Sequence, residues 1–239
     1  MTKMTCGALA ALLLTATAAS AQDVTLRYAF QNPESHPLAQ AAARFAESVS
    51  ARTDGAVEVQ LFPGGQLGKV KDVVQGLQLG AIDMTLAKPG HVADLGAESF
   101  NVLSLPYMFT DQEHMRRVLH AEIGDEMLAS LNDIRLQGVG FYLDSPRHFF
   151  FVDTPVTNVE DMAGLKIRTL TSEVAADTVE AFGASATPMA FSELYGALQA
   201  GVVDGADQPL TGFFAQQYQE IAKHIVLDGH DASPTIILM

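Results

Sequence analysis

The chain has 239 residues, enough for one large domain or two smaller ones with a sizeable hydrophobic core. Hydrophobic residues make up 48% of the chain and charged residues 18%, a composition that excludes a disordered protein. The formal net charge of −14 argues against nucleic acid and anionic membranes as partners, although the local field of a cleft can still attract a small anion.

The first 21 residues have the pattern of a signal peptide. Lys3 gives a positive start, a short apolar run follows, and residues 19–21 (Ala-Ser-Ala) fit a cleavage site. The run is too short for a transmembrane anchor. The only cysteine, Cys6, lies in this segment, so the mature chain from Gln22 has no disulfide and no cysteine-bound metal. We therefore predict a protein exported to the periplasm of a Gram-negative bacterium.

Strands and helices alternate in the first part of the mature chain. We predict strands at 24–30, 57–61 and 81–87, a helix capped by Ser35, and a helix from Val70 to about Gly80. This βαβαβ order predicts a largely parallel sheet with helices on its faces. Helices near 111–120 and 123–132 and strands at 136–142 and 149–152 follow.

The second part of the chain continues the alternation. We predict a strand at 164–167, a helix capped by Ser172, a strand at 187–189, a helix at 192–200, a strand at 202–206, a helix opened by Pro209 with Phe213, Phe214, Tyr218 and Ile221 on its apolar side, and strands at 225–227 and 235–239. Because the chain stops at Met239 inside a strand-like run, we expect the sequence to be truncated.

Arg168 is the central candidate for function, because it follows a short apolar run and precedes a helix. It is therefore expected at the carboxyl end of a strand, where ligands collect in open α/β sheets. The guanidinium fork suits a carboxylate held by two parallel hydrogen bonds. The alternative is a surface arginine paired with Glu160 or Asp161.

Other candidates leave two interpretations open. Arg147 precedes three phenylalanines, so its stem packs on an aromatic strand or its head faces a cleft. Phe191 is a core residue or a stacking wall for a ligand. Lys88 follows a predicted strand and is a solvated lysine unless it faces a cleft.

Catalytic motifs are absent from the sequence. No H-E-x-x-H, G-x-S-x-G or EF-hand pattern occurs, and the seven histidines lack metal-ligand spacing. The cluster of Asp228, His230 and Asp231 is more typical of a polar turn than of a metal site. The absence of these motifs argues against an enzyme without excluding one, and we predict no cofactor, no bound metal and no enzymatic activity.

Several motifs, taken together and in order, resemble the DctP-type substrate-binding proteins of TRAP transporters. They are Phe62–Gly68 (FPGGQLG), Leu105–Tyr107 (LPY), Glu160–Arg168 (EDMAGLKIR), Gly183–Tyr195 (GASATPMAFSELY), Ala197–Gln199 (ALQ) and Val203–Gly205 (VDG). The resemblance covers nearly the whole mature chain. It implies an α/β, two-lobed periplasmic-binding-protein fold, with a ligand cleft between the domains and hinge strands that cross between them.

The resemblance also implies domain boundaries and partners. Domain I is expected at 22–145, with 234–239 returning to it, and domain II at 146–233. The ligand is expected to be an organic acid anion, delivered to the TRAP membrane permease by a monomeric protein. The family continues beyond the position of Met239 with elements that complete both lobes.

The ligand contacts that follow from the resemblance and from the residues together are Arg168, Arg147, Gln208, Phe191, Lys88, Gln31 and Asp207. Arg168 would grip the carboxylate, and Arg147 would add charge or close the cleft. Gln208 stands where an asparagine usually helps to hold the carboxylate, and Lys88 stands where many members carry a polar or acidic residue. If Lys88 faces the cleft, it could admit a second negative group.

Two alternatives to transport remain open. An enzyme could act on an organic acid in the same cleft, with His148 or Asp207 as acid or base. A ligand-presenting partner of a membrane sensor would use the same binding site.

Overall fold

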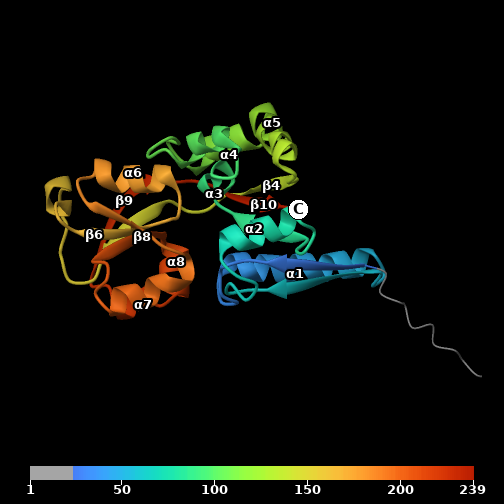
Figure 1. The fold of residues 1–239 in the computed structure, drawn as a ribbon, viewed down its shortest axis with the longest axis horizontal. Coiled ribbons are helices and arrows are strands. Elements are labelled where there is room, and N and C mark those ends of the chain that lie inside the picture. Colours follow the sequence, from blue (N-terminus) through green and yellow to red (C-terminus); the bar gives the residue numbers. More distant parts are fainter. Residues whose placement is uncertain (1–23) are drawn as a thin grey trace, which may run out of the picture.

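The computed structural model describes residues 24–239. The predicted signal peptide, with Lys3, Cys6 and the cleavage site, lies outside the described residues. Two lobes, each built on a five-stranded sheet, stand side by side (Figure 1). The predicted α/β class and two-lobed architecture are confirmed.

The first lobe is built on a mixed sheet with strand order β2-β1-β3-β10-β4. Its strands are β1 (Val24–Ala29), β2 (Val57–Phe62), β3 (Met84–Ala87), β4 (Gly138–Tyr142) and β10 (Thr235–Leu238). Strands β1, β2 and β3 are parallel, whereas β10 is antiparallel to both β3 and β4. The sheet is therefore only partly parallel, because the returning strand β10 enters it from the other lobe.

Helices cover both faces of the first sheet. They are α1 (Pro37–Arg52), α2 (Val70–Gln78), α3 (Pro89–Ala93), α4 (Gln112–Leu119) and α5 (Glu122–Ser130), with 3-10 turns at Glu98–Ser104 and Leu131–Ile134. One core cluster contains Val74, Phe100 and Met115, and the other contains Phe30 and Leu38. Each fully buried side chain of this size contributes about 1.5–3 kcal/mol to folding.

The second lobe has the strand order β7-β6-β8-β5-β9. Its strands are β5 (Arg147–Phe151), β6 (Lys166–Thr169), β7 (Ser185–Pro188), β8 (Gly205–Pro209) and β9 (His224–Asp231). Its helices are α6 (Glu173–Ala181), α7 (Leu194–Gln199) and α8 (Leu210–Ala215), with 3-10 turns at Val159–Met162, Phe191–Glu193 and Tyr218–Glu220. Strands β6, β7 and β8 are parallel, and β5 runs antiparallel to its two neighbours β8 and β9.

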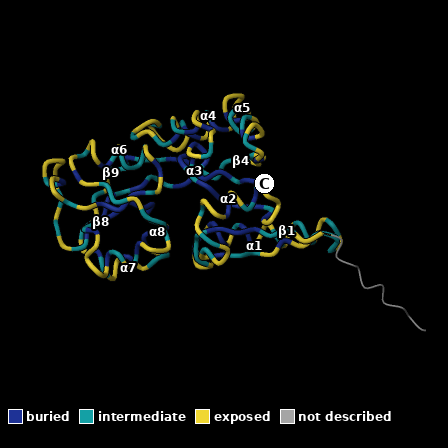
Figure 2. Tube along the Cα trace, viewed as in Figure 1, coloured by how far each residue is buried: buried dark blue, intermediate teal, exposed yellow. Residues whose placement is uncertain are grey.

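Two segments connect the strands of one sheet directly to strands of the other. Residues 143–146 join β4 to β5, and residues 232–234 join β9 to β10. In Figure 2 the crossing region is largely buried, in contrast to the exposed outer turns of both lobes. These two crossings place Asp144 and Ser233 between the sheets, where the residues of both lobes meet.

Several local predictions are wrong for identifiable reasons. His36, not Ser35, caps α1, because its Nδ1 accepts a hydrogen bond from the Leu38 backbone N–H. The strand predicted at 202–206 is β8 at 205–209, because Gly201 has φ = 67° and the turn takes the preceding residues. Phe214 is 59% exposed rather than apolar-facing, since α8 ends at Ala215.

The cap predicted at Ser172 is confirmed, because its side chain accepts from the Ala175 N–H. Arg168 lies within β6, one residue before the strand ends. Among the described residues, no helix has the length and apolar character needed to cross a bilayer.

Candidate ligand site between the lobes

A cleft with about 670 Å³ of empty space, part of it open to solvent, is lined by residues of both sheets and of the crossings. The first lobe and the crossings contribute Gln31, Asn32, His36, Leu38, Val70, Leu86, Ala87, Lys88, His91, Asp144 and Thr235; the second lobe contributes Arg147, Leu170, Phe191, Gln208, Pro209 and Gly212. Five of the seven predicted contacts are therefore on the wall, and Arg168 and Asp207 are not.

Arg168 is buried behind this wall, with 1% of its surface exposed. Its Nε and Nη2 donate to the Met189 carbonyl at 3.1 and 2.9 Å. Its Nη1 is buried and has no hydrogen-bond partner among residues 24–239. The predicted alternative, a surface arginine paired with Glu160 or Asp161, is wrong, because the side chain is buried and Asp161 instead accepts from Thr157 and Asn158.

Burial lowers the pKa of Arg168, the charge of Asp207 opposes this shift and the charge of Arg147 adds to it, and the resulting pKa is about 10. The side chain therefore stays charged at neutral pH. Within residues 24–239, no Asp or Glu forms an ion pair with it. A buried cation with an unused N–H donor carries a large desolvation cost until a further acceptor arrives.

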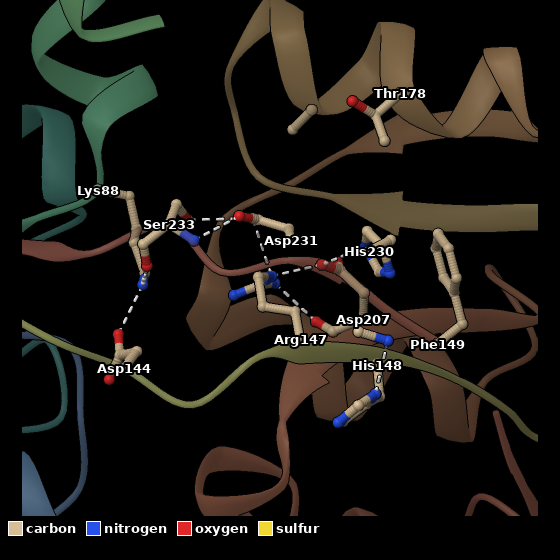
Figure 3. A network of polar contacts seen from close by, with 12 residues as sticks. Lys88, Asp144, Arg147, His148, Phe149, Thr178, Asp207, His230, Asp231 and Ser233 are labelled. Atoms are coloured by element: carbon tan, nitrogen blue, oxygen red, sulfur yellow. Dashed lines mark hydrogen bonds and ion pairs between the residues drawn. The ribbon is translucent and has the colours of Figure 1, made fainter. Parts of the chain in front are cut away.

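Arg147 lies at the start of β5 and contacts two carboxylates and a backbone carbonyl. Its Nε donates to Asp207 Oδ2 and its Nη2 donates to the Asp207 carbonyl at 2.7 Å, and Asp231 lies 3.7 Å from Nε. Figure 3 shows the guanidinium pointing between these two aspartates. Burial would lower the pKa of Arg147, but the charge and hydrogen bond of Asp207 raise it above its ordinary value.

Asp207 and His230 extend this network away from the cleft. His230 Nε2 lies 3.4 Å from Asp207, its Nδ1 lies 2.6 Å from Asp228, and its ring stacks on Phe149 at 4.1 Å. Burial alone would raise the pKa of Asp207, but Arg147 and the hydrogen bond from His230 hold it well below its usual range. Burial opposes the charge on His230, yet the hydrogen bonds to Asp207 and Asp228 raise its pKa to about 9.

Lys88 lies between the two crossings and binds both of them. Its Nζ donates to Asp144 Oδ2 at 2.6 Å and to the Ser233 carbonyl at 3.0 Å, and Thr235 Oγ1 donates to the same carboxylate oxygen at 2.7 Å. Figure 3 shows Lys88 bridging from the end of β3 to Asp144 and Ser233. Lys88 thus lines the cleft as one partner of a buried ion pair, not as a solvated lysine.

Three further residues on the cleft wall differ in exposure and in hydrogen bonding: Gln208, Phe191 and Gln31. Gln208 is 6% exposed, and its side-chain amide makes no hydrogen bond within the described chain. Phe191 is half-buried at the start of the turn before α7. Gln31 is already committed, because its Nε2 donates to the Gly68 carbonyl at 2.9 Å.

Four further residues line the cleft although no local sequence pattern indicated them: His36, His91, Asp144 and Thr235. Burial, and then the positive charges of Arg168, Lys88 and Arg147, lower the pKa of His91 to about 4. Three cations therefore act on one point of the cleft. The spacing of Lys88 and Asp144, 56 residues apart, offered no local signal for their pairing.

The remaining acid-base candidates do not lie on the cleft wall. His148 Nδ1 accepts from the Gly229 N–H at 3.0 Å, and Asp207 is bound by Arg147. Asp228, His230 and Asp231, expected in a polar turn, lie at the end of β9. Within residues 24–239, no group of three or more His, Cys, Asp or Glu side chains is arranged to hold a metal ion.

Two lobes joined by two crossings, with a cleft containing buried cations between them, define the class of two-lobed solute-binding proteins. The model of the family DctP, described as bacterial extracellular solute-binding protein family 7, matches residues 28–239. The chain belongs to this family.

Individual relatives agree with this assignment. The C4-dicarboxylate-binding periplasmic protein DctP of Rhodobacter capsulatus is 35% identical over 94% of this chain and 67% of its own length. A TRAP periplasmic solute binding protein from Citrobacter koseri, solved with bound D-glucuronate, has a TM-score of 0.85 and 34% identity over 90% of this chain and 71% of that one.

Another TRAP protein, from Sulfurospirillum deleyianum and solved with succinate, has a TM-score of 0.87 and 28% identity over 91% of this chain and 70% of that one. The chain spans about two thirds of the length of the curated relatives it matches, with 66% and 65% covered in two further cases.

Proposed function

We propose that this protein captures an organic acid anion in the cleft between its lobes and delivers it to the membrane permease of a TRAP transporter. The relatives support the ligand class, because D-glucuronate and succinate, found in two of the similar structures, both carry a carboxylate. The periplasmic relative supports a location in the periplasm, reached through the signal peptide at residues 1–21.

The observation that carries the proposal is that Nη1 of Arg168 has no partner in the part of the chain that the structure describes. A buried guanidinium that lacks an ion-pair partner is satisfied best by a carboxylate that arrives from outside the chain. Leu170, two residues after Arg168, and Phe191, two residues after Met189, line the cleft, and Arg168 binds the Met189 carbonyl. In this proposal the carboxylate therefore approaches Nη1 from the cleft.

The other cleft residues take supporting roles in this proposal. The free amide of Gln208 donates a further hydrogen bond, and Phe191 packs against the body of the ligand. Arg147 is held by Asp207 and adds positive electrostatic potential to the cleft without donating a hydrogen bond to the ligand. Domains at 22–145 with 234–239, and at 146–233, then close on the ligand about the two crossings, and closure is what the permease recognises.

The test is calorimetric binding of monocarboxylates, dicarboxylates and sugar acids to the protein and to Arg168→Ala. Charge-assisted hydrogen bonds contribute about 1.5–3 kcal/mol each, so we expect Arg168→Ala to weaken binding by at least about 100-fold. Arg168→Lys keeps the charge but loses the fork, and should recover only part of the affinity.

Arg44→Ala, an exposed arginine on α1, is the matched control and should leave the affinity unchanged. A loss of less than about threefold in Arg168→Ala would remove Arg168 from the site, because such a loss is about 0.65 kcal/mol, below the roughly 1.5–3 kcal/mol of one charge-assisted hydrogen bond. Conversion of the bound acid into another compound would support the enzyme alternative instead.

A further inference from the structure

The charged groups in and behind the cleft are equal in number, four cations and four carboxylates, but they are paired unequally, because Arg147 faces two carboxylates and Arg168 faces none within ion-pair distance among residues 24–239. The cations are Lys88, Arg147, Arg168 and His230, and the carboxylates are Asp144, Asp207, Asp228 and Asp231. Every cation except Arg168 has a carboxylate oxygen within 4.0 Å. The positive charge available to a ligand is therefore that of one guanidinium.

Arg147 is unavailable to a second carboxylate for a geometric reason. Asp207 takes its Nε and Asp231 lies 3.7 Å from the same atom, so two carboxylates already face this guanidinium. A third carboxylate would meet the repulsion of both, at close range and in a poorly solvated site.

Lys88 is unavailable for a different reason, because it holds the two crossings together. Two of its three N–H donors go to Asp144 and to the Ser233 carbonyl, one on each crossing. Drawing Lys88 toward a ligand would leave Asp144 buried at 7% exposure without its cation. Breaking a buried ion pair costs more free energy than an exposed ion pair with a ligand would contribute.

The same end of the cleft has groups that suit hydroxyls. Asp144 lines the cleft, and its Oδ1 accepts no hydrogen bond from the described residues. His36 is kept neutral, because burial lowers its pKa. Since its Nδ1 accepts from the Leu38 N–H, its Nε2 carries the proton and can donate. An acceptor and a neutral donor bind a hydroxyl, and the acceptor repels a carboxylate.

We propose that the cleft selects acids with a single carboxylate and a hydroxylated body, and discriminates against the corresponding diacids. The carboxylate binds Arg168 and Gln208, and the hydroxyls face Asp144 and His36. This inference rests on the proposed function, and it replaces the expectation that Lys88 admits a second negative group.

The experiment uses ligand pairs that differ only in one terminal group. D-gluconate and D-glucarate differ by a terminal hydroxymethyl against a carboxylate at six carbons, and erythronate and meso-tartrate differ in the same way at four. Affinities are measured by calorimetry at one pH and salt concentration. We expect the monoacid of the better-fitting length to bind at least about tenfold more tightly than its diacid, because the second carboxylate finds no free cation.

A variant sharpens the result. Asp144→Asn removes the negative charge that neutralises Lys88 while keeping an oxygen that accepts from Lys88 and Thr235. We expect the ratio of monoacid to diacid affinity to fall by about tenfold or more in this variant. Asp133→Asn, an exposed aspartate far from the cleft, should leave the ratio unchanged.

The outcomes separate the two proposals. A diacid that binds as well as its monoacid in the unmodified protein overturns the selectivity and leaves organic acid capture standing. Failure of every acid to bind or to raise the melting temperature overturns both. If Asp144→Asn does not fold, the paired affinities of the unmodified protein still decide the question.

Discussion

Lys88 and Arg168 are both cations removed from solvent, yet the chain treats them differently. Lys88 is satisfied by a carboxylate and a carbonyl from the two crossings. Among the described residues, Arg168 donates hydrogen bonds only to the Met189 carbonyl, and its Nη1 has no acceptor. The first arrangement stabilises the connection between the lobes, and the second leaves an interaction for a ligand. Both cations are shielded from solvent, so burial does not distinguish their roles. A cation whose donors are satisfied within the chain stabilises the fold (a structural charge), whereas a cation with an unsatisfied donor can bind a ligand.

Arg147 extends this comparison, because it resembles Lys88 in its pairing and in lining the cleft, and Arg168 in the depth of its burial. It lines the cleft but is held by Asp207 and Asp231. Replacing it should therefore damage the fold more than the binding chemistry. The predictions below test this division.

The largest effect is expected for Arg147→Met. This change leaves Asp207 buried with His230, at 3.4 Å, as its remaining cationic partner, and removal of one partner from a buried pair costs about 3–5 kcal/mol. We expect urea denaturation to show a loss of that size in the free energy of unfolding. The double variant Arg147→Met/Asp207→Leu removes both charges and should recover most of the loss. If the single variant is as stable as the parent, Arg147 is not a structural charge.

A second effect concerns pH. His230 has its pKa raised to about 9, from an ordinary value near 6.5 in the unfolded chain. Its protonation stabilises the fold fully below pH 6.5, and this stability disappears as the pH rises through 9. The shift corresponds to at most about 3 kcal/mol. We expect thermal stability to fall between pH 7 and pH 9.5, and this fall to be absent in His230→Gln.

His224→Gln provides the control for that pH profile, because His224 lies on the same strand and forms no ion pair among the described residues. Its profile should match the parent. A parent protein whose stability is flat over this range would show that His230 is neutral when folded.

The sequence predicted the larger features of this molecule well. The alternation of strands and helices, the cap at Ser172 and the position of Arg168 near a strand end depend on local patterns. The partners of Lys88 and Arg147 could not be predicted from local patterns, because Asp144 is 56 residues from Lys88 and Asp207 is 60 residues from Arg147. Only the folded chain brings such groups together, and so only the structure separates neutralised cations from the one that is free.

The third prediction concerns the stability of the protein with the volume-matched change Arg168→Met. Removing this charge relieves its desolvation but deprives the Met189 carbonyl of its donor, and the two effects oppose each other. We expect the ligand-free protein to keep its free energy of unfolding to within about 1 kcal/mol, while binding is lost. A destabilisation as large as that of Arg147→Met would place Arg168 among the structural charges.

The smallest effect is expected for a charged pair on the surface of the protein. Lys69 of the first lobe and Glu193 of the second form an ion pair of 2.8 Å across the rim of the cleft. Both side chains are about half exposed, so water and salt screen the pair. We expect Lys69→Ala to change ligand affinity by less than about fivefold, with the difference vanishing in 0.5 M salt.

The charge-swapped variant Lys69→Glu/Glu193→Lys is the matched control for that pair, because it keeps the attraction and reverses its direction. It should bind like the parent. A loss of more than about tenfold in Lys69→Ala, restored by the swap, would mean that this rim contact holds the lobes closed on the ligand. The position of the ion pair between the lobes would then predict its effect on ligand affinity better than its exposure does. A weak contact that forms only in the closed state shifts the equilibrium toward that state.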